Sequence, residues 1–357
     1  MNVKNIINEI NLSGVVRAYK IEKAESKMMW DDERNGRKKG DPVTQYRGFI
    51  MVQTGENQFA SVRVQKIEGF YDGKPDFTTQ ALEQMANNEV ATFVKTRSLT
   101  ETPTISIYRG VKLVDNVYVK DGQEAGGLQV DLGFGSISLG EPTEEPRFRN
   151  ELTISGVIKG IDEEIVNDEP TGRAKVKVLM PYTYGSEKKG TQVIRAVSLT
   201  LVAGEIEDEE GIYDLGADLL DYGDELIDTS WIFYSELNGY SVETEQKPKE
   251  EDEEPAGRRF GRQRQTVETR SNFSSKQEYL MVGLAELEGD NAFDEEEMND
   301  AKRERERFIA EKIKEEEEKQ GQAEAARPAP GRLSSGRERV ASSAGERTGR
   351  SRTRNFS

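Results

Sequence analysis

The sequence contains no cysteine and no histidine among its 357 residues. Their absence excludes disulfide bridges, zinc sites built on thiolate or imidazole ligands, and catalysis by a cysteine nucleophile or a histidine base. Long apolar runs are also missing, since no stretch approaches the roughly 18 consecutive apolar residues of a membrane span. The opening residues MNVKNIINEINLSG lack the hydrophobic core of a signal peptide. We therefore expect a soluble, cytoplasmic protein without membrane contact.

The sequence also lacks the usual signatures of enzymes that act on phosphates. A glycine-rich loop of the form GxxxxGK[ST] is absent. The acidic clusters Asp31 to Glu33 and Glu207 to Glu210 are contiguous runs, and neighbouring residues of a strand point to opposite sides, so they do not build a two-metal site. We therefore expect no enzymatic activity, no catalytic residue, no metal and no cofactor. A metal-dependent nuclease is the enzymatic alternative, and its activity would be abolished by a chelator.

Charge is distributed unevenly along the chain, whose net charge is −17. Residues 1–149 carry 20 basic and 21 acidic side chains, whereas residues 150–247 carry 8 and 21. The end of the chain, 321–357, carries 8 arginines against 3 glutamates and almost no large apolar residues, which predicts a disordered basic tail. We divide the chain into a first domain (1–149), a second domain (150–246), a charged linker (247–271), a strand with a charged helix (272–320) and the tail.

Between residues 10 and 245, β-branched and aromatic residues alternate with polar ones between Gly, Pro, Asn and Asp turns, a pattern that predicts strands. The predicted strands of the first domain are 10–22, 44–53, 57–67, 104–114 and 117–120. Those of the second domain are 151–161, 174–185, 191–205 and 229–237. A helix over 77–89, with Thr78 as its N-cap, and a shorter helix over 215–222 interrupt the two sets. Each domain thus has the order strand, strand, strand, helix, strand.

The two domains begin with related segments. Leu12-Ser13-Gly14-Val15-Val16 resembles Ile154-Ser155-Gly156-Val157-Ile158, and a glycine inside a strand usually marks a bulge or a sharp bend. A long, bent first strand suits a small closed barrel, and five strands with a helix between the third and fourth is the order of the OB-fold.

Residues 9–245 therefore resemble a tandem pair of OB-folds. They are similar to those of single-stranded DNA-binding proteins of the replication kind, such as phages encode. The expected fold class is mainly β: two OB-fold-like small barrels in tandem, each with one short helix, followed by a charged helix and a disordered tail. A β-sandwich of the same strands is the structural alternative.

The resemblance implies binding of single-stranded nucleic acid, DNA rather than RNA, with little sequence preference, in support of replication or recombination. Such binding needs cations that follow phosphates and aromatic faces on which bases stack. The first domain supplies both, and the candidate binding residues are Trp30, Arg34, Arg37, Lys38, Lys39, Tyr46, Arg47, Phe49, Phe59, Arg63, Lys66, Tyr108 and Arg109. The alternative for Phe49 and Phe59 is a position in the core of the barrel. The alternative for Trp30 is a position in a lid over the open end of the barrel.

The second domain and the segments after it suggest other roles. Tyr182 and Tyr184 lie among acidic residues, so this domain is expected to bind nucleic acid weakly or to contact proteins. Residues 272–289 contain one more strand-sized apolar stretch, which either adds an edge strand to a barrel or binds another protein. Residues 290–320 predict a helix capped by Asp294, either solvated or docked on a partner, and 272–320 is the segment expected to recruit replication or assembly proteins. The net charge of −17 does not attract nucleic acid to the molecule as a whole. The alternative is therefore a structural or interaction protein, such as a virion component or an assembly adaptor.

Overall fold

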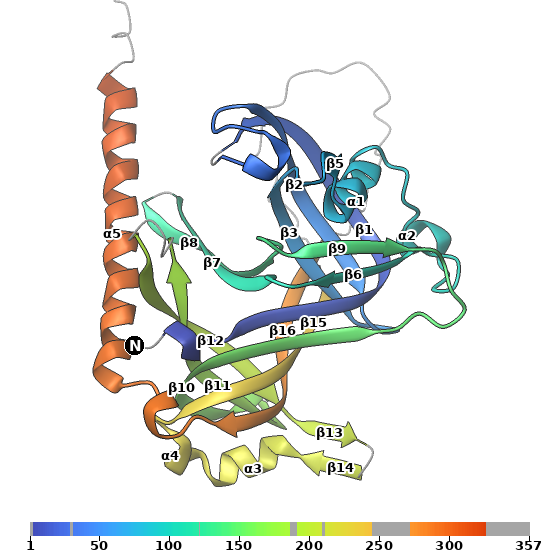
Figure 1. The fold of residues 1–357 in the computed structure, drawn as a ribbon. Helices are drawn as coiled ribbons and strands as arrows, with labels where there is room; N and C mark the ends of the chain where they lie inside the picture. Colours follow the sequence, from blue (N-terminus) through green and yellow to red (C-terminus); the bar gives the residue numbers. More distant parts are fainter. Residues whose placement is uncertain are drawn as a thin grey trace, which may run out of the picture.

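The computed structural model describes residues 3–28, 31–120, 122–185, 191–208, 211–244 and 272–325. The predicted linker over 247–271 lies outside these residues. Of the predicted tail, only residues 321–325 are described, and they belong to a helix rather than to a disordered segment. The predicted fold class is confirmed: the chain forms two OB-fold-like barrels followed by a long helix (Figure 1).

The first barrel is formed by seven strands in a five-stranded order. Its strands are β1 (Asn8–Lys27), β2 (Pro42–Gln53), β3 (Phe59–Ile67), β6 (Thr104–Tyr108), β7 (Lys112–Lys120), β8 (Gln123–Asp131) and β9 (Ser136–Gly140), with a small separate hairpin of β4 (Phe70–Tyr71) and β5 (Lys74–Pro75). In this order β6 with β7 and β8 with β9 each occupy one position. β6 and β7 run on as one interrupted strand that pairs with β9 and β8, while β8 is parallel to β3 and β6 is antiparallel to β1. This closed order excludes the sandwich alternative.

The second barrel has the same strand order. Its strands are β10 (Arg149–Val166), β11 (Glu169–Tyr184), β12 (Val193–Ala203), β15 (Ser230–Thr244) and β16 (Asn272–Glu286), and a hairpin of β13 (Glu205–Asp208) and β14 (Gly211–Asp214) lies beside them. β16 pairs parallel with β12 and antiparallel with β15, which in turn pairs with β10. Residues 272–286 therefore belong to the second barrel, which corrects the predicted boundary at residue 246: the closing strand comes after the charged segment.

The two barrels are joined through their first strands. β1 pairs antiparallel with β10 so that Asn8 faces Ile154, Ile10 faces Leu152 and Leu12 faces Asn150. Because the sequence repeat aligns Leu12 with Ile154, it also aligns Asn8 with Asn150, and the pairing is symmetric about Ile10 and Leu152. One apolar core extends through both barrels.

The repeated glycines lie where the first strand of each barrel is crowded. A side chain at Gly14 would place its Cβ 1.9 Å from the backbone oxygen of Gln53, and one at Gly156 would meet Val178 at 2.6 Å. The register shifts a few residues later, between Val16 and Ala18 in the first barrel. Glycine therefore permits the close approach of β1 to β2.

Short helices cover the ends of the barrels. They are α1 (Phe77–Ala86), α2 (Phe93–Thr96), α3 (Leu215–Asp221) and α4 (Gly223–Leu226). The N-cap of α1 is Asp76, whose carboxylate accepts a hydrogen bond from the Thr79 amide at 2.7 Å. The predicted cap, Thr78, lies instead inside the first turn, where its buried hydroxyl accepts a hydrogen bond from the Ile137 amide.

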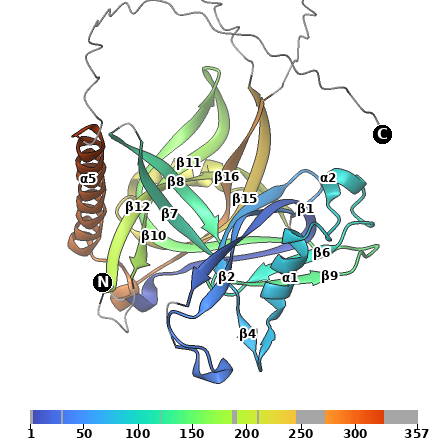
Figure 2. The ribbon, with the colours of Figure 1, turned by 90° about the horizontal axis from the view of Figure 1, so that it is seen from above.

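The charged helix α5 (Glu295–Ala325) begins at the predicted cap, since the Asp294 carboxylate accepts a hydrogen bond from the Glu296 amide. Its first half is docked rather than solvated: Met298 and Ala301 are buried against Val157 and Leu179 of the second barrel. Arg305 reaches the β7–β8 hairpin of the first barrel, which lies beside α5 in Figure 2. Among the described residues, no helix is long and apolar enough to cross a membrane.

Candidate nucleic-acid interface

The outer face of β2 and β3 presents an aromatic ring between two cations. Arg47 and Phe49 alternate with buried residues along β2, so both point away from the core. Phe49 lies opposite Arg63 of β3 in the sheet, and Arg47 lies opposite Gln65. The Phe49 side chain is 38% exposed, an unusual position for a large apolar residue in the middle of a paired strand. We call Arg47, Phe49 and Arg63 the open face.

A hollow of about 400 Å³ adjoins the open face. Phe49, Met51 and Arg63 line it from the first barrel, together with Gln129 of β8, and Gln277 of β16 lines it from the second barrel. The amide nitrogens of Gln129 and Gln277 are both buried and have no hydrogen-bond partner. Buried amide donors are normally satisfied, so these two nitrogens are unpaired donors beside the open face.

The cations of the open face are held in position by neighbouring polar groups. The Arg47 guanidinium donates to the Gln45 side chain, with a distance of 2.8 Å from Nε. Arg63 donates to the side-chain oxygen of Gln65 at 2.9 Å and lies 3.8 Å from the Asp131 carboxylate. Its side chain is 40% exposed, so solvent and a phosphate can still reach it. The acceptors orient both guanidinium groups along the face without burying their charge.

Three of the predicted binding residues point into the barrel or are covered. Tyr46 is 2% exposed, and its hydroxyl donates to Glu83; burial raises the pKa of Tyr46 far above its usual value. Phe59 is 4% exposed and is covered by the Arg17 guanidinium, 4.5 Å from the ring centre. Lys66 donates to the Gly135 carbonyl, and burial lowers its pKa. A base cannot reach the ring of Tyr46 or Phe59, which corrects the stacking role predicted for Tyr46 and selects the core alternative for Phe59.

The loop between β1 and β2 is shorter than predicted, because Lys27 already pairs with Pro42. Arg37 is not free for a ligand: it forms an ion pair with Glu68 at 2.9 Å and stacks on Phe70 at 3.7 Å. Lys38 and Lys39 are exposed, beside the acidic residues Asp31 and Asp41 that accept their backbone hydrogen bonds. Trp30 and the side chain of Arg34 lie outside the described residues.

Tyr108 and Arg109 lie apart from the open face in the sheet. They are at the end of β6, which pairs with β1 and β9 rather than with β2 or β3. The Arg109 guanidinium lies 5.6 Å from the centre of the Tyr108 ring, and Arg109 has a positive φ of 59° at the turn into β7. The structure therefore brings together Arg47, Phe49 and Arg63 but not Tyr108 and Arg109.

Sequence reasoning missed Gln129 and Gln277 as lining residues. Gln129 lies in a glycine-rich segment, QEAGGLQVD, whose strand signal is weak, and Gln277 lies in a strand assigned to another domain. No local signal links Gln277 to Phe49, because the contact depends on how the two barrels pack.

The second barrel has an acidic hollow on its surface, in contrast to the open face of the first barrel. A hollow of about 770 Å³ is lined by five carboxylates and one arginine: Glu205, Glu207, Asp214, Glu236, Glu278 and Arg173. Burial raises the pKa of Glu236. No group of three or more acidic side chains in the described part of the chain is arranged to hold a metal ion. This surface repels phosphates and leaves the first barrel as the side available to a polyanion.

Solved structures similar to this chain are of single-stranded DNA-binding proteins. A deletion mutant of the single-stranded DNA-binding protein from Thermus aquaticus shares 12% identity, with 82% of this chain and 98% of that chain covered and a TM-score of 0.39. The wild-type Thermus aquaticus protein shares 10% identity, with 80% and 94% covered and a TM-score of 0.39. A replication protein A heterotrimer bound to single-stranded DNA shares 10% identity, with 81% and 69% covered and a TM-score of 0.18. At this distance no site residue is carried over from them.

No curated protein sequence matches the chain. A family match is found for residues 8–318, which it assigns to YorF. These residues run from the start of β1 into α5 and so include both barrels, the open face and the docked part of the helix. The chain therefore belongs to the YorF family.

Proposed function

We propose that this protein binds single-stranded nucleic acid, DNA in preference to RNA, across the open face of the first barrel and without catalysis. The observation that carries the proposal is the exposed ring of Phe49 between Arg47 and Arg63, next to two glutamine amides without partners. A base stacks on the ring, the guanidinium groups neutralise phosphates, and the amides donate to an acceptor on the base or backbone. We further propose a role in replication or recombination in the cytoplasm.

The arrangement also supports low sequence specificity. Every base has a π-face, so stacking on Phe49 accepts all four bases. Two flexible glutamine amides can satisfy several acceptors and do not define one base edge. Duplex DNA hides its base faces, so the same ring offers it no stacking contact. Preference for single strands over duplex is therefore expected from this geometry.

The test is fluorescence anisotropy of the full chain with a labelled single strand of about 30 nucleotides. The Phe49→Ala variant should bind more weakly by roughly 1–3 kcal/mol, or about 5-fold to 150-fold, because one stacked base is lost. Its melting temperature should barely change, since the ring is already partly exposed. Phe77→Ala is the matched control: Phe77 is 81% exposed at the start of α1, away from the open face, and its loss should leave the affinity unchanged.

Salt dependence tests the electrostatic part of the same proposal. Each phosphate that the protein neutralises releases counterions and steepens the fall of log affinity against log salt by about 0.7 for a single strand. Arg47→Gln and Arg63→Gln should each make this decline shallower by about that amount. Equal affinities for Phe49→Ala and the unaltered protein, or no salt-sensitive binding at all, would instead favour a structural or docking role for the barrels.

A further inference from the structure

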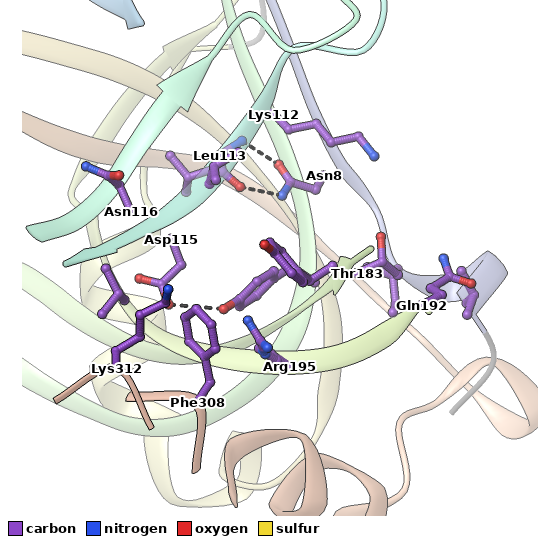
Figure 3. Close-up of a pocket in the computed structure, with 16 residues that line it drawn as sticks. Asn8, Lys112, Leu113, Asp115, Asn116, Thr183, Gln192, Arg195, Phe308 and Lys312 are labelled. Carbon is purple, nitrogen blue, oxygen red and sulfur yellow. Dashed lines mark hydrogen bonds between the residues drawn. The ribbon is translucent and has the colours of Figure 1, made fainter. Parts of the chain in front are cut away.

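A cavity of about 570 Å³ lies between the two barrels and α5, apart from the open face (Figure 3). One wall is β7 of the first barrel, from Lys112 to Val117. The other walls are the end of β11, the start of β12 and one face of α5, which contributes Phe308 and Lys312. Its volume falls in the range of small-molecule binding sites.

The cavity contains an arginine for which the described residues supply no counter-ion. Arg195 is 7% exposed, and its guanidinium lies between two aromatic rings, 4.6 Å from the centre of Tyr184 and 3.8 Å from that of Phe308. Its Nε has no hydrogen-bond partner, and within the described residues no carboxylate lies at ion-pair distance from it. The rings stabilise the cation in part, but a buried charge without an opposite charge remains costly.

The other charged groups of the cavity leave this excess uncompensated. Asp115 is the acidic residue among the lining side chains, but its carboxylate already accepts hydrogen bonds from Arg305 at 2.6 Å and from the Tyr182 hydroxyl at 3.1 Å. Lys112 and Lys312 add two further cations to the walls. Lys312 lies 5.5 Å from the centre of the Phe308 ring and 3.6 Å from the exposed carboxylate of Glu315.

We propose that this cavity is a binding site for a phosphate group carried on a nucleoside. The phosphate supplies the negative charge that Arg195 lacks, Lys312 adds a second cation to the same cavity, and a guanidinium matches the geometry of phosphate oxygens. The space beyond the phosphate has amide side chains from Asn116 and Gln192, which suit the polar edges of a sugar or base. The phosphate group can come from either of two ligands, a free nucleotide or a nucleotide within a bound single strand. The site does not depend on the open face.

Calorimetric titration of the full chain with thymidine 5′-monophosphate tests the site, with uncharged thymidine as the comparison. The monophosphate should bind, inorganic phosphate should compete with it, and thymidine should bind at least tenfold more weakly because the ionic hydrogen bonds are missing. Lys312→Ala should weaken monophosphate binding severalfold. Lys314→Ala, an exposed lysine of the same helix that does not line the cavity, is the control and should leave it unchanged. Arg195→Met should abolish binding, and if that variant fails to fold, Lys312→Ala decides.

The proposal is overturned if thymidine binds as tightly as its monophosphate, if neither binds, or if the two lysine variants behave alike. A thymidine decanucleotide without terminal phosphate distinguishes the two sources. Displacement of the monophosphate identifies the strand as the source, whereas binding without displacement identifies a free nucleotide. Phe49→Ala should keep the monophosphate affinity while losing strand affinity, so a failure of this site and a failure of the open face give different results.

Discussion

At the residue scale, two asparagines carry the same contact in both barrels. Asn8 donates to the Leu113 carbonyl and accepts from the Leu113 amide, both at 2.8 Å. Asn150 makes the same pair of hydrogen bonds with Leu237, at 2.6 and 3.1 Å. Both asparagines are buried. Each side chain therefore ties the first strand of its barrel to the fourth, through backbone groups that would otherwise be unsatisfied.

We expect Asn8→Ala to lower the free energy of unfolding by about 1–3 kcal/mol, because a buried backbone donor and acceptor lose their partner. Asn150→Ala should cost a similar amount. Urea denaturation measures both. Asn11→Ala, on the same strand as Asn8 but half-buried, is the comparison and should cost less. If Asn8→Ala were as stable as Asn11→Ala, the bidentate contact would contribute nothing to the fold.

Tyr279 makes stability sensitive to alkaline pH. Burial raises the pKa of its hydroxyl to about 12 from an ordinary value of 10.0. Above pH 10 the unfolded chain releases this proton while the folded chain keeps it, so the free energy of unfolding should fall as the pH rises from 10 to 12. The Tyr279→Phe variant should lose less stability across this range, as measured by urea midpoints at each pH. The same decline in variant and parent would contradict this role for Tyr279.

Strand alternation accounts for only part of what the structure shows at the residue scale. Arg47 and Phe49 are two residues apart on β2 and both lie on its exposed side. Phe59 and Arg63 are four residues apart on β3, yet Phe59 is buried and Arg63 is partly exposed. By the same alternation Tyr46 and Lys66 point inward, next to Ile50 and Val64, so choosing them for their chemistry alone was a mistake. The partners of Arg37 could not be foreseen, because Glu68 and Phe70 are about thirty residues away in the chain.

At the element scale, α5 contacts both barrels and holds them together. Its apolar residues pack on the second barrel, while Arg305 pairs with Asp115 and Glu124 of the β7–β8 hairpin in the first. The Asp115 side chain is 1% exposed, so its charge depends on this arginine and on the Tyr182 hydroxyl. The sequence predicted the helix and its cap, but its thin apolar stripe suggested a solvated helix because the ionic contact was invisible.

Replacing Arg305 should break the contact between α5 and the β7–β8 hairpin. We expect Arg305→Gln to destabilise the protein by about 3–5 kcal/mol, because a buried carboxylate would be left without its cation. A second change, Asp115→Asn, should recover much of this loss. Arg303→Gln, at an exposed residue two positions earlier, should change stability by less than about 0.5 kcal/mol. Denaturation curves give these values, and a harmless Arg305→Gln would show that the hairpin does not need the helix.

At the scale of the whole molecule, the two barrels share a sheet and an apolar core, and both contact α5. β1 pairs with β10, one apolar cluster includes residues of both barrels, and α5 contacts both. Element order and the internal repeat were enough to predict two barrels. They did not reveal β8 and β9 as barrel strands, because glycines weaken their strand signal. They left β16 open between an edge strand of a barrel and a protein contact, because a charged segment separates it from its neighbours in the chain.

This shared construction predicts that the two barrels unfold together, although chains of this size often unfold in steps. The chain has two tryptophans, and a Trp30→Phe variant keeps only Trp231, on β15 of the second barrel. Its tryptophan fluorescence and far-ultraviolet circular dichroism should show the same urea midpoint. Separate midpoints would mean that each barrel is stable without the other.

The symmetric pairing of β1 with β10 has a consequence for how such a chain evolves. Asn8 faces Ile154 as Leu12 faces Asn150, which is the isologous contact of a two-fold homodimer contained in one polypeptide. In a true homodimer every mutation occurs on both sides. A fused pair escapes that constraint, so one copy can accumulate carboxylates while its sister retains an arginine-flanked ring. The pairing of β1 with β10 keeps a two-fold symmetric backbone, while the surfaces of the two barrels differ.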